Sequence, residues 1–529
     1  MTTPRAADSA ADGAAGSEAV ENRDGWTGLL ADLAVRREAG AAMGGAAKVA
    51  RRAAAATAAG QHGRLDARSR IAALCDPGSF VELGVLAGTE GHAADGFVAG
   101  QGLVAGRPVY VGAEDVTVAG GSIGTAGATK RARILHLAGR ERVPVVLILE
   151  GAGHRATNAL TPHRPAPNDL QAMVDLAGLV PVVVLVAGPA AGHSALAAPL
   201  ADHVILVDPA GCLFSAGPPL VTAATGEQVT KEALGGAAVH AEASGVVHQV
   251  VGSDADGVAA VARYLSYLPS SAWQWPPVAG DSRDVGPRSL DRLLEIIPPN
   301  PRRPYDMRAV LAELVDAGSL YELAPAYGTA MLTALGRLGG EPVAIVANQP
   351  AVRGGAIDVD AAEKGARFVE RAAAFHLPLI QLADNPGVLA GSASERAGIL
   401  RSGARMFAAQ HRAAGPKIHV TLRKAFGFGS SIMGQNAFGG QSLSLAFPGV
   451  TLGGIPAGVG AATSGADDAT RDALVSAQAS GPWQLAATAT YDDIIDPREL
   501  RTALLDGLRT LGSRRAAAPE PVSRVGYLP

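Results

Sequence analysis

Residues 181–194 read PVVVLVAGPAAGHS, and residues 416–430 read PKIHVTLRKAFGFGS. Each stretch begins with proline, continues as a β-branched and Leu-rich apolar run, and ends in a turn that contains glycine. An apolar run of this kind predicts a strand buried on both faces. Because glycine has no Cβ, main-chain amides in such a turn can approach a ligand closely. The two stretches therefore predict two pockets lined by N–H groups, which can stabilise a developing oxyanion.

These stretches belong to an internal repeat with a period of about 235 residues. Three further segments recur in the same order: CDPGSFVELG (75–84) as VDAGSLYELA (315–324), GLVAGRPVYVGAEDVTV (102–118) as GRLGGEPVAIVANQPAV (336–352), and RVPVVLILEGAG (142–153) as HLPLIQLADNPG (376–387). Lys130 corresponds to Lys364. In each half, short apolar strands alternate with Ala-rich helical segments such as 127–140 and 361–375. The pattern predicts a duplicated α/β domain with parallel strands and crossover helices.

The length of 529 residues favours two large domains over a single core. We expect residues 1–24 to be disordered, because they contain few large apolar side chains. A helical region should follow from Trp26 to about Ala59, with a break near Gly44 and Gly45. The predicted domains are 25–280 and 307–518, joined by a Pro-rich linker at 281–306, and 519–529 form a tail. Asp496 is expected to cap a C-terminal helix that begins at Pro497.

Composition excludes several classes of function. The net charge of −4 and the pI of about 6.3 give no indication of nucleic acid binding or of a basic membrane surface. Two cysteines do not form a disulfide framework, and the histidines lack the pairing with carboxylates that a metal site needs, so no metal is expected. No apolar run approaches the length of a membrane helix, and a cytoplasmic setting is expected. The phosphate-binding loop of ATP-dependent enzymes is absent.

Gly192-His193-Ser194 suggests a second interpretation, the nucleophile elbow of hydrolases and acyltransferases. That elbow requires glycine where Leu196 stands, and side chains adjacent in sequence point apart, so His193 and Ser194 should not form a catalytic dyad. A third interpretation gives the glycines a packing role only. The repeat favours the oxyanion interpretation, because both glycine turns occupy the same position in their halves.

The chain resembles the carboxyltransferase (β) subunits of biotin-dependent acyl-CoA carboxylases, of the propionyl-CoA and acetyl-CoA carboxylase type. The resemblance covers about Gly45 to Leu511 and rests on long motifs: QHGRLDARSRI with DPGSFVELG, AGGSIGTAGATK, TGEQVTKEALGGAAVH, YLPSS, IVANQP, DNPGVLAG, GILRSGAR, LRKAFGFG and YDDIIDPRE. It implies two crotonase-like domains per chain and a homo-hexamer built as a trimer of dimers. Each active site would lie between the N-half of one subunit and the C-half of another.

The resemblance also implies the reaction and the partners. Carboxybiotin on a separate carrier protein would release CO2, biotin would take the α-proton of an acyl-CoA, and the enolate would attack CO2. Because the chain has neither a Met-Lys-Met biotinylation motif nor an ATP-grasp glycine loop, the biotin carrier and biotin carboxylase would be partner chains. Coenzyme A thioester is the implied substrate, and no metal is implied.

Site residues follow from the resemblance position by position. The amides of Gly192 and His193 would hold the thioester oxygen, and those of Phe428 and Gly429 the biotin oxygen. Substrate-binding residues would be Gly153 and Arg155 near the CoA, with Gly427 and Ser431 at the second pocket, where Ser431 would influence the acyl-chain size. The family usually has glycine at 193, Gly-Gly-Ala at 427–429 and DSGGAR at 150–155, and the segment between Ala462 and Tyr491 is shorter here.

These departures leave three functional hypotheses. The first is carboxyl transfer to propionyl-CoA, acetyl-CoA or a less usual acyl-CoA. The second is an acyl-CoA decarboxylase of the same fold, and the third is a non-catalytic subunit of a carboxylase complex. Only glycine readily adopts positive φ, so side chains at 193 and 428 would disturb the turns if those positions required it.

Overall fold

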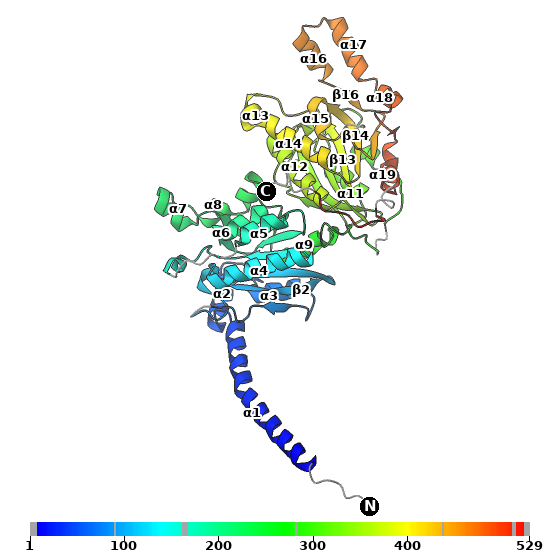
Figure 1. The fold of residues 1–529 in the computed structure, drawn as a ribbon. Helices are drawn as coiled ribbons and strands as arrows, with labels where there is room; N and C mark the ends of the chain where they lie inside the picture. Colours follow the sequence, from blue (N-terminus) through cyan, green and yellow to red (C-terminus); the bar gives the residue numbers. More distant parts are fainter. Residues whose placement is uncertain are drawn as a thin grey trace, which may run out of the picture.

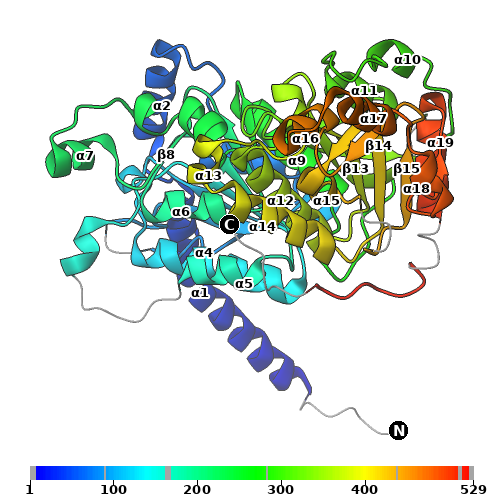
Figure 2. The ribbon, with the colours of Figure 1, turned by 90° about the horizontal axis from the view of Figure 1, so that it is seen from above.

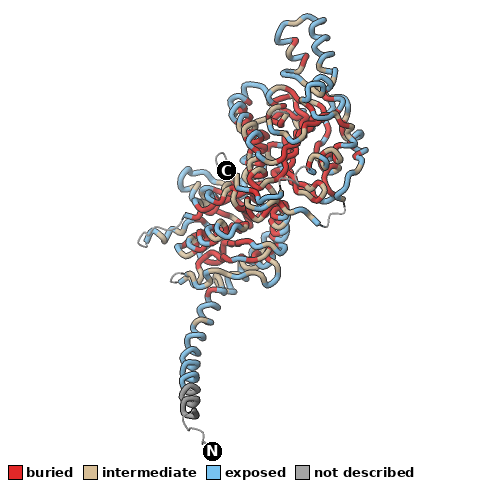
Figure 3. The backbone as a smooth tube through the Cα atoms, turned by 45° about the vertical axis from the view of Figure 1, so that its right-hand side comes forward, coloured by how far each residue is buried: buried red, intermediate tan, exposed pale blue. Residues whose placement is uncertain are grey.

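The computed structural model describes residues 8–88, 91–160, 168–280, 284–435, 439–509 and 515–522. Two α/β bodies follow one another along the chain, and a long N-terminal helix extends from the first (Figure 1). Figure 3 shows that buried residues fill both bodies while the described part of this helix is largely exposed. In the described part of the chain, no helix is long and apolar enough to cross a membrane.

The N-half has a mixed sheet whose seven described strands lie in the order β1-β2-β3-β4-β5-β7-β9. The first three pair antiparallel and the others parallel. The strands are β1 (Val81–Leu83), β2 (Phe97–Val104), β3 (Arg107–Glu114), β4 (Val145–Leu149), β5 (Val182–Val186), β7 (His203–Val207) and β9 (Gln249–Val251). A small parallel pair lies apart from this sheet: β6 (Pro189–Ala191) with β8 (Cys212–Phe214).

The helices of the N-half include the crossover connections that the sequence predicts. The segment 127–140 lies within α4, as expected. The helices are α1 (Asp8–Ala41), α2 (Ala46–Ala58), α3 (Ala67–Leu74), α4 (Thr125–Glu141), α5 (Asp169–Leu176), α6 (His193–Leu200), α7 (Pro218–Thr225), α8 (Lys231–Gly235) and α9 (Asp254–Tyr267).

The C-half repeats the architecture. Its described strands follow the order β10-β11-β12-β13-β14-β15-β17, with β16 also paired to β14, and again the first three are antiparallel. The strands are β10 (Tyr321–Leu323), β11 (Met331–Leu338), β12 (Glu341–Asn348), β13 (Leu379–Asn385), β14 (Lys417–Phe426), β15 (Leu443–Ala446), β16 (Thr451–Gly453) and β17 (Asp493–Ile494). The helices are α10 (Leu293–Ile296), α11 (Met307–Leu314), α12 (Val359–Ala374), α13 (Ser392–Ala397), α14 (Ile399–Arg412), α15 (Gly427–Ile432), α16 (Ala457–Ser464), α17 (Asp468–Gln478), α18 (Trp483–Ala487) and α19 (Leu500–Arg509).

The duplication extends to individual backbone angles. The β2–β3 hairpin turns at Ala105 and Gly106 with φ of 49° and 75°, and the β11–β12 hairpin turns at Gly339 and Gly340 with φ of 63° and 80°. Two successive residues with positive φ are typical of the hairpin turn that matches strand twist. The predicted internal repeat is therefore a repeat of structure, down to the turns.

The repeated lysines anchor equivalent helices. Lys364 in α12 donates from Nζ to the carbonyl oxygens of Ala324, Tyr327 and Met331 at 2.7, 2.9 and 2.8 Å. Lys130 in α4 likewise donates to the carbonyl of Ala94. Both lysines are buried, and buried ammonium groups need such partners. The matched lysines thus have a structural role at the crossover helices.

The two halves share a core. One cluster of buried apolar residues includes Val261 and Leu265 of α9 together with Phe368, Val369 and Ala372 of α12. A hydrogen bond also joins the halves, since Nε2 of His203 in β7 lies 2.9 Å from the hydroxyl of Tyr321 in β10. The halves are therefore packed against each other and not merely tethered.

The N-terminal segment is helical where the sequence predicts disorder. Residues 8–24 are the beginning of α1, so the expected disorder of 1–24 is wrong for its described part. The reason is composition: alanine and glutamate favour helix even where no core is available. Residues 1–7 and 523–529 lie outside the described residues, as do 281–283 of the expected linker, and the domain boundaries stay predictions. Asp496 does cap the turn at Pro497–Glu499, accepting from the Arg498 amide at 2.9 Å.

Candidate active site

Both glycine turns adopt the same backbone conformation. After β5 and the short β6 the chain turns at Gly192, with φ of 55°, and enters α6. After β14 it turns at Gly427, also with φ of 55°, and enters α15. A side chain at positive φ is strained, so glycine is favoured at these two positions. In both halves, therefore, a parallel strand leads through a glycine turn into the first residues of a helix, at the same position of the repeat.

His193 and Phe428 do not stand at strained positions. Neither has positive φ, because His193 is the first residue of α6 and Phe428 the second of α15. Their side chains turn onto neighbouring helices: His193 contacts α5, and the Phe428 ring lies 6.0 Å from the Phe407 ring of α14, between centroids. The replacement of family glycines at 193 and 428 is therefore compatible with both turns.

A second loop packs against each turn. A Cβ built on Gly153, whose φ is 80°, would lie 2.5 Å from the Ala191 carbonyl oxygen. In the C-half a Cβ built on Gly429 would lie 2.3 Å from Asn385 Oδ1 and 2.7 Å from Gly387 Cα. Glycine at 153 and 429 thus permits the close approach of two backbone segments. Gly387, which sequence reasoning missed as a site residue, is the repeat equivalent of Gly153, and that equivalence could have identified it.

The amide of Gly192 is already occupied. It donates to the carbonyl of Phe214 at 2.9 Å, because the pairing of β6 with β8 continues to the turn. Gly192 therefore cannot serve as the expected oxyanion donor. The amide of His193 remains a candidate, since the first N–H groups of a helix have no acceptor within that helix. The structure thus gives Gly192 a turn-forming role, and the amide of the residue that follows it stays the candidate donor.

A buried network of hydrogen bonds and ion pairs contacts the first two residues of α6. His193 Nε2 lies 2.5 Å from Asp169 Oδ1, and Asp169 Oδ2 accepts from Arg131 Nε at 2.8 Å. Arg131 Nη1 donates to Glu114 Oε1 at 2.7 Å, and Ser194 Oγ donates to the same oxygen at 2.5 Å. His193 and Ser194 thus use different carboxylates, in agreement with the expectation that they form no dyad. Asp169, Arg131 and Glu114 escaped sequence reasoning, because nothing local in their segments links them to the turn.

Arg155 is engaged inside the protein. Its Nη2 donates to Asp95 Oδ1 at 2.5 Å and to the Ser122 carbonyl at 2.9 Å, and its Nε donates to Ser122 Oγ at 3.1 Å. Its side chain is 11% exposed. The guanidinium therefore fixes the loop after β4 to the loop before α4, and this structural role differs from the expected contact with CoA.

The remaining expected residues gather at the second turn. Ser431 lies in α15, half-buried, and its carbonyl accepts from Gln410 of α14 at 3.1 Å. Gly427 and Phe428 precede it in the same helix, with the Phe428 ring 40% exposed. The structure thus brings Gly427, Phe428, Gly429 and Ser431 together on α15. Figures 1 and 2 place α15 and α6 in different bodies of the chain, so the two turns do not meet within it.

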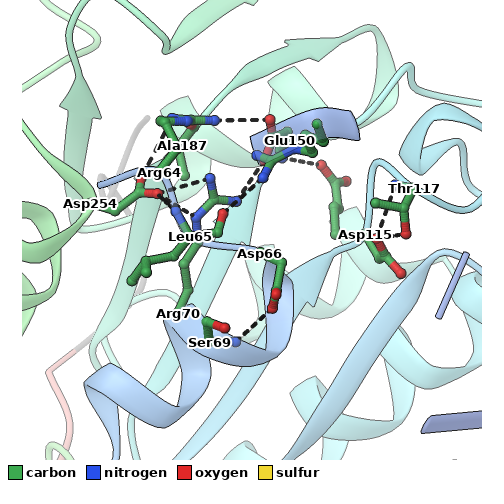
Figure 4. A network of polar contacts seen from close by, with 12 residues as sticks. Arg64, Leu65, Asp66, Ser69, Arg70, Asp115, Thr117, Glu150, Ala187 and Asp254 are labelled. Carbon is green, nitrogen blue, oxygen red and sulfur yellow. Dashed lines mark hydrogen bonds and ion pairs between the residues drawn. The ribbon is translucent and has the colours of Figure 1, made fainter. Parts of the chain in front are cut away.

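The QHGRLDARSRI motif anchors the loop that begins at Glu150. Glu150 Oε1 accepts from Arg64 at 2.9 Å, Oε2 accepts from Arg70 at 2.6 Å, and Arg52 also contacts it (Figure 4). Arg70 is fully buried and also donates from Nε and Nη2 to Asp254 Oδ2 of α9, both at 3.2 Å. The arginines of the motif thus have a structural role: they hold the loop after β4 against α3 and α9.

The acid stability of the N-half should depend on Asp169. Burial raises the pKa of this carboxyl, but the hydrogen bond from His193 and the charge of Arg131 outweigh it and lower the pKa to about 2, below the ordinary 3.8. A lowered folded pKa gives stability that is present above the unfolded value and is lost as the pH falls through the folded one. We expect the stability advantage of the native chain over Asp169→Asn to shrink by about 2 kcal/mol between about pH 5 and pH 2.

Urea unfolding at a series of pH values measures this difference. Asp468→Asn is the matched control, because its side chain is 87% exposed on α17 and should give a difference that hardly changes with pH. If the free energy of unfolding of Asp169→Asn differed from that of the native chain by the same amount at every pH, the lowered pKa of Asp169 would be contradicted.

Comparison with known proteins connects this geometry to a family. Residues 59–525 match the carboxyl transferase domain family, which is most of the chain. The chain belongs to that family. It is 34% identical over 515 residues to the methylmalonyl-CoA carboxyltransferase 12S subunit of Propionibacterium freudenreichii subsp. shermanii, covering 93% of this chain and 96% of that one. It is also 34% identical over 466 residues to the methylmalonyl-CoA decarboxylase subunit alpha of Veillonella parvula, covering 86% and 91%.

A solved structure of the transcarboxylase 12S subunit, described as a hexamer with methylmalonyl-CoA and methylmalonic acid bound, superposes with a TM-score of 0.85. It is 32% identical and covers 94% of this chain and 98% of that one. The expected resemblance is therefore confirmed. This carboxyl transferase family member has the crotonase-like fold and is an enzyme, a carboxyltransferase subunit of the acyl-CoA carboxylase type.

Proposed function

We propose that this chain moves a carboxyl group between biotin, carried by a separate protein, and the α-carbon of a short acyl-CoA such as propionyl-CoA or acetyl-CoA. The observation that carries the proposal is the pair of equivalent glycine turns, each at a helix N-terminus, in a chain similar over almost its whole length to carboxyltransferase subunits. Carboxyl transfer through an enolate needs stabilised negative charge on two oxygens, and two turns of this kind supply main-chain donors for it.

At the first turn the donor is the amide of His193. We assign it to the thioester oxygen, which becomes an enolate oxygen when the α-carbon loses a proton or CO2. A preorganised amide stabilises that charge more than it stabilises the neutral thioester, and loss of one such donor typically costs about 2.7–4 kcal/mol. Gly153 lies against the turn, and a Cβ at this position would displace the backbone at Ala191 and so the amide of the turn.

The second turn fits the ureido group of biotin. Its donors are main-chain amides near Phe428 and Gly429, and the Phe428 ring presents a half-exposed apolar face beside them. Neutral donors and an aromatic face suit a neutral planar ring with one carbonyl oxygen. When bound, biotin supplies the carboxyl group and a nitrogen base, and the residues of this turn hold its oxygen and orient its ring. Ser431, half-buried in the same helix, is assigned to the wall that limits the acyl chain.

Assembly is part of the proposal. Because the two turns lie in different bodies of one chain, a complete site requires the N-half of one subunit and the C-half of another. The 12S transcarboxylase structure is described as a hexamer, and we propose a homo-hexamer, built as a trimer of dimers, for this chain too. A biotin carrier and a biotin carboxylase are the proposed partner proteins.

Decarboxylation is a second candidate function. A relative of 34% identity is named a methylmalonyl-CoA decarboxylase subunit. That reaction uses the same enolate and the same first turn, with CO2 released instead of transferred.

Transfer to free biotin tests the proposal. Purified chain should carboxylate biotin with malonyl-CoA or methylmalonyl-CoA as donor, because both amide turns are present without the partner proteins. The measurement is formation of carboxylated biotin together with acetyl-CoA or propionyl-CoA, over a panel of acyl groups of increasing length. Absence of transfer for every donor, from a protein that elutes as a hexamer, would favour the non-catalytic hypothesis instead.

A further inference from the structure

His193 brings a titratable side chain to the turn proposed for the thioester. Its imidazole is 31% exposed, whereas the carboxylate of Asp169 that contacts it is only 5% exposed. The two groups lie 2.5 Å apart, from Nε2 to Oδ1. An imidazole with one nitrogen on a buried carboxylate and partial access to solvent has the arrangement of a proton-transfer residue.

Asp169 fixes which nitrogen of His193 carries the proton. Arg131 occupies the other carboxylate oxygen at 2.8 Å, and Glu114 in turn holds Arg131 at 2.7 Å. Asp169 is thus a carboxylate with both oxygens accepting, so Nε2 of His193 must be the donor to it. Nδ1 is then the nitrogen that can gain or lose a proton during a reaction. Asp169 is the positioning residue of the pair.

The second turn has no equivalent. Phe428 stands where the repeat places His193, and its ring packs on Phe407 and against Gly403 of α14. The two turns therefore share their backbone but differ in side-chain chemistry: one presents an imidazole and the other an apolar ring. A proton is needed only on the side where the α-carbon of the acyl group changes its bonding, and the imidazole lies on that side.

We infer that His193, oriented by Asp169, donates a proton to the α-carbon of the enolate, which gives the chain a biotin-independent decarboxylase activity toward 2-carboxyacyl-CoA thioesters. This inference rests on the proposed placement of the thioester at the first turn. The bond between the α-carbon and the carboxylate breaks, CO2 leaves, and its electron pair forms the enolate. The α-carbon then takes the proton from Nδ1, and water returns a proton to the imidazole. The net reaction consumes one proton and releases one CO2.

The test is CO2 release from methylmalonyl-CoA by the full-length chain without biotin, in D2O. We expect CO2 and propionyl-CoA that carries one deuterium at the α-carbon. The rate should decrease as the pH rises, because the reaction consumes one proton. The charged groups that contact His193 directly or through its partner are Asp169 and Arg131. The pKa of the Asp169 carboxyl is lowered to about 2 and that of the Arg131 guanidinium is raised, so both stay charged near neutral pH.

Two variants separate proton transfer from structure. His193→Gln keeps a donor to Asp169 but cannot transfer the proton, so kcat should fall about 100-fold, the pH dependence should disappear and KM should change little. Asp169→Asn should lower kcat by a smaller factor and leave a pH dependence in place. His136→Gln, an exposed histidine of α4, is the matched control and should behave as the native chain.

The outcomes distinguish this inference from the proposed function. Transfer to free biotin without any biotin-independent CO2 release would overturn the inference and leave carboxyl transfer intact. Equal CO2 release by the native chain and His193→Gln would also overturn it. Loss of both reactions in the native chain would count against the placement of the thioester itself, and therefore against the proposed function.

Discussion

Gly192→Val should reduce carboxyl transfer on the order of 100-fold or more while the chain still folds. Gly192 has φ of 55°, where a β-branched residue is strongly disfavoured. The backbone should relax by shifting the start of α6, and the amide of His193 would then no longer point where the enolate charge develops. The effect acts through geometry, since the Gly192 amide itself is bonded to Phe214. Steady-state transfer to free biotin measures it.

Gly78→Val is the matched control for backbone strain. Gly78 has φ of 73°, and no atom of the described residues lies within 4 Å of a Cβ built there. Both substitutions should cost about 1–3 kcal/mol of stability, but only the one at 192 should lower the rate. If Gly192→Val turned over as fast as Gly78→Val, the first turn would have no part in the reaction.

Asp254→Ala should destabilise the N-half by about 3–5 kcal/mol, because it leaves a buried arginine with too few partners. Asp254 Oδ2 accepts from Arg70 and from the Leu65 amide, the latter at 2.6 Å, and Oδ1 lies 3.5 Å from Arg64 (Figure 4). Asp254 and Arg70 are buried almost completely. Denaturant unfolding followed by circular dichroism gives the free energy of unfolding.

Asp256→Ala provides the comparison on the same helix. Asp256 is exposed near the start of α9, where its carboxylate accepts from Ser253 at 2.7 Å. Its removal should cost less than about 1 kcal/mol. Equal losses for the two variants would mean that the buried network adds nothing beyond the effect of an acidic residue in the first turn of a helix.

The repeat, the strands and the position of the two turns could be predicted from sequence. The apolar runs at 181–186 and 416–422 lie in buried strands, and Gly192 and Gly427 follow them with identical φ. These features depend on local properties: the period of apolar residues, the β-propensity of branched side chains, and the positive φ angles that glycine adopts most readily. The prediction of disorder for 1–24 is wrong for the described part of that segment, because a composition poor in large apolar residues can still favour a helix.

The roles of individual site residues could not be predicted in the same way. Arg155 was expected at the CoA, yet Asp95 and Ser122 occupy its guanidinium, and both come from loops far earlier in the chain. The Gly192 amide was expected to be a donor to substrate, yet the strand that ends at Phe214 takes its hydrogen bond. Neither partner is visible in the local sequence, because parallel strands with long crossovers bring distant segments together.

By itself, the sequence determined that this protein is a doubled α/β enzyme of the carboxyl transferase family whose glycine turns begin two equivalent helices. Only the tertiary structure decided what faces those turns: Asp169 behind His193 at one, and Phe407 behind Phe428 at the other. The physical reason is that backbone conformation follows from neighbouring residues, whereas the partner of a buried polar or aromatic group is set by which elements pack together. That packing places an imidazole at one turn and an apolar ring at its twin.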